Sequence, residues 1–222
     1  MGKENILLFG ASDHARSTID IVEQEARFHI VGILDFGKKI NTEFAGYEIL
    51  GTDDDLTDII SSYNVGSGIV TIGDNNTRRK VVNKIVTKHI GFKFVTAVHP
   101  SAIIGKNTTI GDGSVLMAGT IINNDSKIGE HCYVGCNASV DHDSILGNFS
   151  SVGPGVTTGG TIMIGNCSAV GIGANILHGR VIGHDTIIGA GSLVVQDIGD
   201  LVVAYGSPAK EIRKRNQGDP YL

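Results

Sequence analysis

Hydrophobic positions follow two different patterns along the chain, and the change between them falls near residue 100. Before it, short apolar runs alternate with segments whose apolar residues recur at helical spacing, such as Ile19, Val22 and Ala26. Such runs are typical of strands buried in a parallel sheet, and helical spacing predicts amphipathic helices. Strands are expected at residues 6–9, 29–34, 68–72 and 92–95, and helices around 19–26, 56–60 and 81–86. Residues 1–96 are therefore predicted to form an α/β domain with a Rossmann-like parallel sheet.

From residue 104 onward the apolar positions recur every six residues without a break. Fifteen of the sixteen positions from 104 to 194 are Ile, Leu or Val, Thr158 is the exception, and glycine follows in eleven of them. An aliphatic residue followed by glycine at a period of six is the signature of a hexapeptide β-helix. The aliphatic side chain would fill the interior, and the glycine would permit the tight corner between short strands. Residues 97–222 are expected to form this all-β domain.

Composition narrows the class of protein further. The 222 residues include 31 glycines and 4 prolines, with 41% hydrophobic and 18% charged residues, so the chain can bury a core. A net charge of −5 with scattered basic residues argues against nucleic acid as a partner. No apolar run approaches the ~20 residues of a membrane span and no signal peptide is evident, so a cytoplasmic location is expected. Three cysteines without a CxxC pair favour buried thiols over a disulfide framework or a zinc finger.

Three loops are expected at the carboxyl edge of the first domain's sheet, where ligands bind in such folds. Residues 10–15 could present backbone N–H groups and a helix N-terminus to a phosphate, although they do not form a GxGxxG fingerprint. The plainer alternative is a strand-to-helix turn capped by Ser12 or Asp13. Asp35 ends the second strand, where a carboxylate commonly accepts hydrogen bonds from a sugar hydroxyl. With residues 73–78, these loops favour a nucleotide or sugar-phosphate pocket.

The hexad register also predicts which residues stack on one another. Three hexads make a coil of 18 residues, so residues 18 apart lie in adjacent coils at the spacing of paired strands. His142, Gly160 and His178 are separated by 18 and 18 and should form a column. A histidine beside a backbone N–H is a plausible pair of general base and oxyanion donor. His131 is interpreted, with the other remaining histidines, as a surface or turn residue.

Several motifs together resemble the sugar O/N-acyltransferases of the NeuD/PglD type. They are the hexads, the opening Gly-Ala-Ser-x-His-Ala at residues 10–15, Ser-Val-Asp-His-Asp-Ser at 139–144, and the closing Gly-Ser-Pro-Ala-Lys at 206–210. The resemblance covers essentially the whole chain. It implies a left-handed β-helix, a homotrimer with acetyl-CoA between neighbouring helices, and N-acetylation of a nucleotide-linked amino-dideoxy sugar for surface glycan biosynthesis. A UDP-linked 4-amino sugar is favoured, with GDP- or dTDP-linked sugars as alternatives.

The resemblance also implies roles for individual residues. His142 and Asp143 form the catalytic pair, and the Gly160 N–H is the oxyanion donor. The residues expected to bind the nucleotide sugar are Ser12, Asp13, His14, Asp35, Lys38, Gly73, Asn75 and Arg78, and those expected to bind the cofactor are Ser151, Gly160, Gly171, Gly189 and Lys210. The chain departs from the family's pattern in three places: Asp13 replaces a glycine, Phe36 replaces the second acid of an Asp-Asp pair, and Ser151 stands where relatives often carry a histidine.

The expected mechanism is direct attack of the amine on the thioester, without an acyl-enzyme and without a metal. His142 would take the proton, and Asp143 or, as the other candidate, Asp141 would orient its ring. Three alternatives stay open at this point. One is O-acetylation of a sialic acid or another sugar, and the second is a non-catalytic scaffold that binds nucleotide sugars. The third is a β-helix metalloenzyme like the carbonic anhydrases, in which His142, His178 and His184 would hold zinc.

Overall fold

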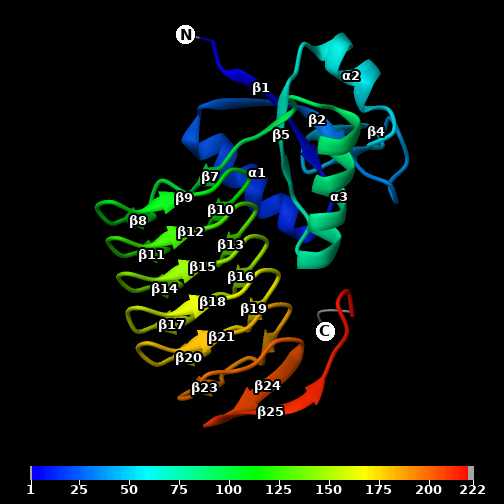
Figure 1. Ribbon diagram of the computed structural model, residues 1–222. Helices are drawn as coiled ribbons and strands as arrows, with labels where there is room; N and C mark the ends of the chain where they lie inside the picture. Colours follow the sequence, from blue (N-terminus) through cyan, green and yellow to red (C-terminus); the bar gives the residue numbers. More distant parts are fainter. Residues whose placement is uncertain (1, 220–222) are drawn as a thin grey trace.

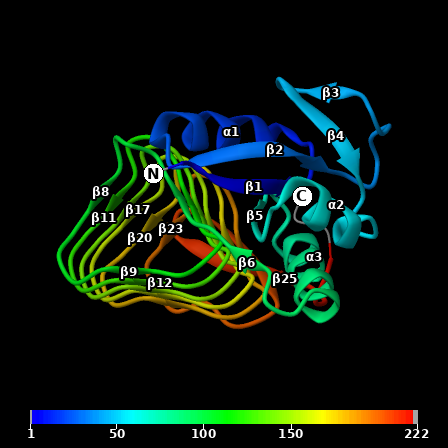
Figure 2. The ribbon, with the colours of Figure 1, turned by 90° about the horizontal axis from the view of Figure 1, so that it is seen from above.

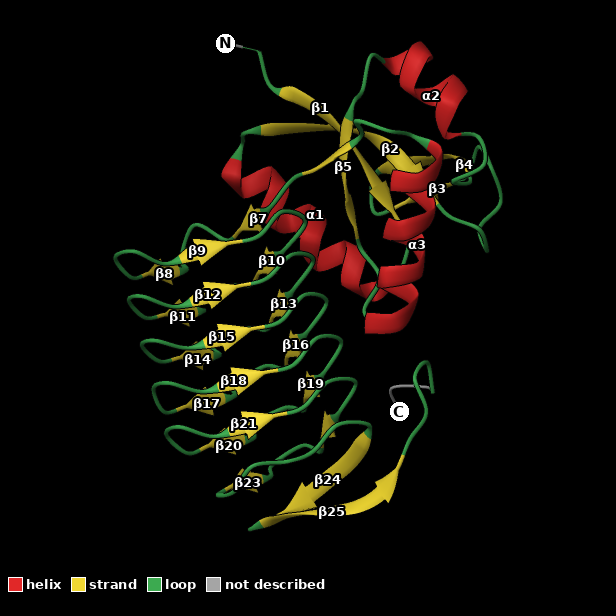
Figure 3. Ribbon diagram, viewed as in Figure 1, coloured by secondary structure: helices red, strands yellow, loops and turns green. Residues whose placement is uncertain are grey.

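The structure is a computed structural model that describes residues 2–219. Met1 and residues 220–222, at the outer ends of the two expected domains, lie outside the described part. In Figure 1 the first part of the chain forms an α/β unit beside the upper coils of a tall stack of short strands, which the rest of the chain forms. All described helices belong to the α/β unit (Figure 3).

The first unit is the predicted Rossmann-like domain. Its sheet has the order β3-β4-β2-β1-β5-β6, and all neighbouring pairs are parallel except β3 with β4. The hairpin β3–β4 was not predicted, because it is short and only partly buried. The elements are β1 (Glu4–Phe9), α1 (Asp13–Glu25), β2 (Phe28–Leu34), β3 (Glu43–Phe44), β4 (Tyr47–Gly51), α2 (Leu56–Tyr63), β5 (Ser67–Val70), α3 (Asn75–Lys88) and β6 (Lys93–Phe94).

The second unit is the predicted left-handed β-helix, whose three faces are parallel sheets of stacked strands (Figure 2). The first sheet contains β7 (Ala97–Val98), β10 (Val115–Leu116), β13 (Tyr133–Val134), β16 (Ser151–Val152), β19 (Ala169–Val170), β22 (Ile187–Ile188), β24 (Val202–Gly206) and β25 (Ala209–Lys214). The second contains β8 (Ile103–Ile104), β11 (Ile121–Ile122), β14 (Ser139–Val140), β17 (Thr157–Thr158), β20 (Asn175–Ile176) and β23 (Leu193–Val194). The third contains β9 (Thr109–Ile110), β12 (Lys127–Ile128), β15 (Ile145–Leu146), β18 (Met163–Ile164) and β21 (Val181–Ile182).

The strand register follows the hexad spacing, since Tyr133 pairs with Ser151 and Ser151 with Ala169, each 18 residues further on. The hexad aliphatics fill the interior, where residues such as Val134 and Val152 are fully buried. At the far end, β24 and β25 form an antiparallel hairpin that closes the stack (Figure 1).

The glycines that follow eleven of the hexad positions have a different role from the expected one. The left-handed backbone of each corner falls two residues later, at every sixth residue from Asn107 (φ 60°) to Gly191 (φ 66°). A Cβ on Gly129 would instead lie 2.7 Å from the backbone nitrogen of Asn148 in the next coil. The glycine is therefore required because successive coils approach closely, and not because the corner needs its conformational freedom.

The two units share a packed interface. Helix α1 contacts β7 of the β-helix, and Ile19 and Val22 pack in one cluster with Ala97, Val115 and Met117. This contact brings the carboxyl edge of the Rossmann-like sheet next to the corners of the middle coils. Within residues 2–219, no helix is long and apolar enough to cross a membrane.

Candidate active site

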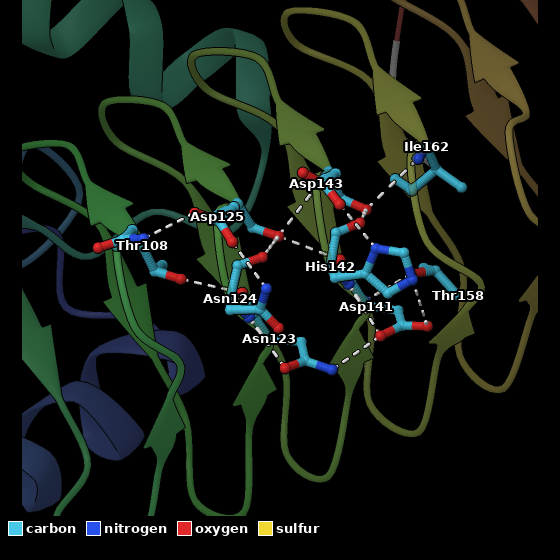
Figure 4. A network of polar contacts seen from close by, with 12 residues as sticks. Thr108, Asn123, Asn124, Asp125, Asp141, His142, Asp143, Thr158 and Ile162 are labelled. Atoms are coloured by element: carbon cyan, nitrogen blue, oxygen red, sulfur yellow. Dashed lines mark hydrogen bonds and ion pairs between the residues drawn. The ribbon is translucent and has the colours of Figure 1, made fainter.

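The histidine of the predicted catalytic pair lies at the corner between β14 and β15, on the outside of the β-helix (Figure 4). His142 Nδ1 lies 2.8 Å from Asp143 Oδ2. Asp143 occupies the left-handed position of its corner, with φ 55°. Since the carboxylate can only accept, Nδ1 carries the proton and Nε2 is left with a free lone pair. The hydrogen bond that His142 donates to Asp143, more than any other contact, raises the pKa of His142 above its usual value.

Gly160 lies directly against the His142 ring in the next coil. A Cβ on Gly160 would fall 2.6 Å from His142 Nε2, so only glycine fits under the ring. The N–H of His142 itself is capped by the side chain of the preceding Asp141, at 2.8 Å. At the equivalent position before Gly160 stands Gly159, which has no side chain that could cap the Gly160 N–H in this way. No acceptor within residues 2–219 contacts the Gly160 N–H. The corner therefore presents an open lone pair and an open backbone donor side by side.

The three histidines of the metalloenzyme alternative are not brought together. His178 stacks beyond Gly160 with its ring centroid 6.3 Å from that of His142. His184 lies at the next corner of its coil, where its Nδ1 accepts the Asn166 N–H at 2.9 Å. In the part of the chain that the structure describes, no group of three or more His, Cys, Asp or Glu side chains is placed to hold a metal ion.

The strand-end loops of the first domain meet at a cavity of about 400 Å³. Ser12 and Asp35, from two of these loops, and Thr77, from the first turn of α3, are among its lining residues. Asp35 holds two of the loops together, because its Oδ2 accepts the Ala11 N–H (2.6 Å) and its Oδ1 accepts the Gly37 N–H (2.8 Å). A cavity at the carboxyl ends of parallel strands can take a nucleotide or a sugar phosphate.

Phe36 and Lys38 follow the same strand, but only Phe36 lines this cavity. Phe36, which replaces an acid of the family's pattern, lines the cavity and is 87% exposed. Lys38 is exposed and lies 5.9 Å from the centroid of the Phe44 ring, and it does not line either cavity described here. The edge of the cavity is therefore apolar and aromatic at the position where the family carries a second carboxylate.

A second cavity, of about 670 Å³, lies between the two domains. Three of the residues expected to bind substrate, Asp13, His14 and Gly73, line it from the first domain. Ser151, Gly171 and Gly189, which are expected to bind the cofactor, line it from the β-helix. The structure thus places predicted substrate and cofactor residues at one shared cavity.

Gly171 and Gly189 cannot offer their own backbone N–H groups to a ligand. The Gly171 N–H bonds to Ile188 O and the Gly189 N–H to Ala204 O, both at 2.8 Å, as part of the coil-to-coil ladder. The N–H groups of the following residues, Ile172 and Ala190, have no acceptor within residues 2–219 and belong to residues that line the cavity. Gly171 and Gly189 therefore line the cavity as expected of cofactor-binding residues, while the open donors belong to the residues that follow them.

Lys210, also expected to bind the cofactor, is exposed on β25 and does not line either cavity.

Burial determines the charge of His14. Its ring packs edge-on against Tyr133 with the centroids 4.5 Å apart. Burial, with a smaller effect of the nearby Arg78 guanidinium, lowers the pKa of His14 to about 4. The side chain is therefore neutral at pH 7 and can offer a ligand one donor and one acceptor, but no charge.

Arg78 has a role that the sequence analysis did not foresee. Its side chain is buried, and the guanidinium donates to the carbonyl oxygens of Ile72 (2.8 Å) and Gly73 (3.0 Å) in the first domain. It also donates to the carbonyl oxygens of His131 (2.9 Å) and Phe149 (3.1 Å) in the β-helix. Arg78 thus connects the two domains.

Asn75 and Ser151 extend this connection. Asn75 Oδ1 accepts from Ser151 Oγ (2.5 Å) and from the Arg78 guanidinium (2.7 Å), while its amide donates to the carbonyl oxygens of Ser168 and Cys167. All three side chains are buried. The polar atoms of Asn75 and Arg78 are thus used between the domains, and neither residue lines a cavity where a substrate was expected. Ser151 gives its hydroxyl to Asn75, but it also lines the second cavity, where the cofactor is expected.

His131 is likewise not the surface residue that was expected. Its ring stacks on Phe149 with the centroids 5.0 Å apart and meets Phe94 edge-on at 4.7 Å. Burial, aided by the Arg78 guanidinium, lowers the pKa of His131 to about 4. Its Nδ1 is buried without a hydrogen-bond partner among the described residues.

The fold and the corner site together define a class of enzyme. A hexapeptide β-helix that sets a histidine-carboxylate pair beside an open backbone N–H can deprotonate a nucleophile and stabilise an oxyanion at neighbouring positions. These are the two requirements of acyl transfer, and the protein is a hexapeptide-repeat acyltransferase.

Comparison with known proteins identifies the family within this class. The PglD N-terminal domain matches residues 5–85, and the bacterial transferase hexapeptide repeats match residues 101–135 and 125–160. Perosamine N-acetyltransferase PerB from Caulobacter crescentus, solved with CoA and GDP-perosamine, is 33% identical over 96% of this chain and 98% of that chain, with a TM-score of 0.87. The acetyltransferase domain of PglB from Neisseria gonorrhoeae, solved with acetyl coenzyme A, is 27% identical over 95% of this chain and 100% of that chain, with a TM-score of 0.86.

Among curated proteins, UDP-N-acetylbacillosamine N-acetyltransferase from Bacillus subtilis is 29% identical over 116 residues, and the match spans about half of each chain (52%). Two of the solved structures of the Caulobacter enzyme carry a histidine replaced by asparagine or alanine. The chain belongs to the family of PglD-type sugar N-acetyltransferases, as its sequence motifs predict.

Proposed function

We propose that the protein transfers the acetyl group of acetyl-CoA to the amino group of a nucleotide-linked amino-dideoxy sugar used for surface glycans. A UDP-linked 4-amino sugar is the first candidate, and GDP- and dTDP-linked sugars follow. The observation that carries the proposal is the corner site, where His142 Nε2 is open, Nδ1 is held by Asp143, and the Gly160 N–H has no acceptor among the described residues. Relatives that act on UDP- and GDP-linked amino sugars support the substrate class.

In the proposed mechanism, His142 Nε2 accepts a proton from the amine as its nitrogen bonds to the thioester carbon. Asp143 stabilises the imidazolium that forms. General base catalysis of this kind, here by His142, is worth typically about 10²–10⁴-fold. The Gly160 N–H stabilises the developing oxyanion, an effect worth roughly 10²–10³-fold in other enzymes. The C–S bond then breaks, and His142 returns the proton to the CoA sulfur.

We propose a division of labour between residues 1–96, which bind the nucleotide sugar, and residues 97–222, which carry the acetyl transfer. Ser12 and Asp35 would hold the nucleotide at the first cavity, with Lys38 nearby. The open N–H groups of the β-helix corner would hold the amide groups of the pantetheine at the second cavity. We also propose a cytoplasmic location for this reaction.

We further propose that the active enzyme is a homotrimer. The second cavity lies along the first sheet of the β-helix and the corner that follows it, whereas His142 lies at the corner between β14 and β15 and does not line either cavity. A neighbouring helix would bring its His142 to this cavity. Size-exclusion chromatography with light scattering should give three times the 23.3 kDa chain mass. A monomeric enzyme with full activity would contradict the proposal.

A single assay tests the activity. Release of the CoA thiol from acetyl-CoA is measured with a panel of UDP-, GDP- and dTDP-linked amino sugars, for the wild-type protein and His142→Asn. We expect turnover with at least one amino sugar and a loss of at least 10²-fold in His142→Asn. His29→Asn, at an exposed position on β2, is the matched control and should keep full turnover. Wild-type turnover by His142→Asn would refute the role of the corner site, and no turnover with any sugar would refute the substrate class.

A further inference from the structure

Asp141, the other acid beside the catalytic histidine, does not contact the nitrogen that Asp143 orients. Its Oδ2 lies 4.0 Å from His142 Nε2, on the side of the ring where the proton must arrive. Its Oδ1 accepts the His142 N–H and the Asn123 amide, both at 2.8 Å. Figure 4 shows this arrangement, with the two acids on opposite sides of the imidazole. No hydrogen-bond donor within residues 2–219 contacts Oδ2.

The backbone around Asp141 departs from the regular coil. At the equivalent position of other coils the N–H joins the ladder, as when the Gly159 N–H bonds to Ile176 O at 2.8 Å. The Asp141 N–H instead bonds to the side chain of Thr158, at 3.1 Å. Thr158 is the one non-aliphatic residue among the sixteen hexad positions. The exception in the repeat thus lies where it positions Asp141.

We infer that Asp141 binds the acceptor amine in its protonated form and so selects amino sugars over their hydroxyl counterparts. The inference rests on the proposed function. Two acceptors that share one nitrogen at hydrogen-bond distance lie roughly 4–5 Å apart, which the separation of Oδ2 and Nε2 satisfies. A hydroxyl brings no positive charge to this position, so the carboxylate favours it far less.

The protonation state of the acceptor makes this binding useful. Amines near electron-withdrawing groups, such as the α-amino group with a pKa of about 7.7–8.0, are largely protonated at neutral pH. Of the three ammonium protons, one leaves through His142 to water before attack, and one stays on the amide nitrogen. The third passes through His142 to the CoA sulfur. Asp141 does not take a proton in any step, and it is a substrate-binding residue.

Charges near Asp141 do not remove its anionic character. The hydrogen bond from the His142 backbone, followed by that from Asn123, lowers the pKa of Asp141. His178 also faces this carboxylate and acts in the same direction. Asp141 is therefore available as an anion throughout the neutral range.

The test compares Asp141→Asn with the wild-type protein for two ligands, a UDP-linked 4-amino-4,6-dideoxy sugar and the same sugar with a 4-hydroxyl group. Affinities are measured by calorimetry in the presence of CoA, which cannot react, and kcat/KM for the amino sugar is measured with acetyl-CoA. We expect the affinity for the amino sugar to fall about tenfold and that for the hydroxyl sugar to change less than twofold. Thr158→Val should reproduce part of the loss, and Thr158→Ser, which keeps the hydroxyl, should restore it.

Asp125→Asn is the charge control, because it removes one carboxylate from the same corner of the preceding coil, where Asp125 binds Asn107 and Asn124. It should leave the ratio of the two affinities unchanged. Equal losses for both ligands in Asp141→Asn, or no loss for the amino sugar, would overturn the inference while leaving the proposed function intact. A wild-type protein that turns over no amino sugar would overturn the proposed function itself.

Discussion

Replacing Arg78 by alanine tests whether one buried side chain holds the two domains together. The guanidinium reaches three acceptors of the β-helix: His131 O (2.9 Å), Phe149 O (3.1 Å) and Ser151 Oγ (3.3 Å). Hydrogen bonds to charged groups contribute about 1.5–3 kcal/mol each. Relief of the buried charge offsets part of this sum, and we expect a net loss of about 3–5 kcal/mol in the free energy of unfolding.

The measurement is urea unfolding followed by far-UV circular dichroism, since the chain has no tryptophan for fluorescence. Arg78→Ala should move the midpoint to lower urea and separate an early transition of the α/β domain from a later one of the β-helix. Arg78→Lys should recover only part of the loss, because an ammonium cannot reach acceptors in so many directions.

Lys80→Ala is the matched control, two residues further along α3 and exposed, and it should change stability by less than about 0.5 kcal/mol. A loss below about 1 kcal/mol in Arg78→Ala, with a single transition, would refute the argument that Arg78 connects the domains.

Three further predictions concern the corner site and the buried histidine. Asp143→Asn removes the main cause of the raised pKa of His142, so the acidic limb of the pH profile of kcat/KM should move to lower pH; an unmoved limb would contradict this. Gly160→Ala places a methyl group 2.6 Å from the His142 ring, and kcat should fall about 10²-fold with the melting temperature nearly unchanged. The pKa of His131 is about 4 in the folded protein, against 6.5 for a free histidine side chain. Its contribution to folding stability is therefore complete above pH 6.5 and is lost as the pH falls toward 4. This pKa difference corresponds to up to about 3 kcal/mol in the free energy of unfolding. His131→Phe should therefore flatten the dependence of urea unfolding on pH, and an identical slope in wild type and variant would exclude His131 as the cause of that dependence.

The sequence predicted best where the pattern is periodic. The hexads predicted the β-helix, which the structure and the comparisons confirm, and the spacing of 18 anticipated the contact of His142 with Gly160 that the structure contains. Local spacing was sufficient there, because every coil repeats the geometry of the previous one. Thr158 was visible as an exception in the repeat, but its partner Asp141 became evident only from the coordinates.

The contacts between the domains could not be predicted in the same way. Asn75 and Arg78 follow a strand end that is typical of a ligand loop, yet their partners lie 53 to 93 residues away in the sequence. Contacts at such separations leave no periodic signal. Gly171 and Gly189 do line the cavity between the domains, but the sequence does not reveal that the coil-to-coil ladder uses their N–H groups and leaves those of the next residues open.

The unbroken register limits how this chain can change during evolution. His142 meets Gly160 only because 18 residues separate them, so inserting one residue between positions 142 and 160 would place a different residue under the imidazole. Length changes in the loop at residues 36–42 do not alter that spacing. Variation in chain length should therefore accumulate in the loops of the first domain, so that new sugars can be accommodated there while the distance between base and oxyanion donor is inherited unchanged.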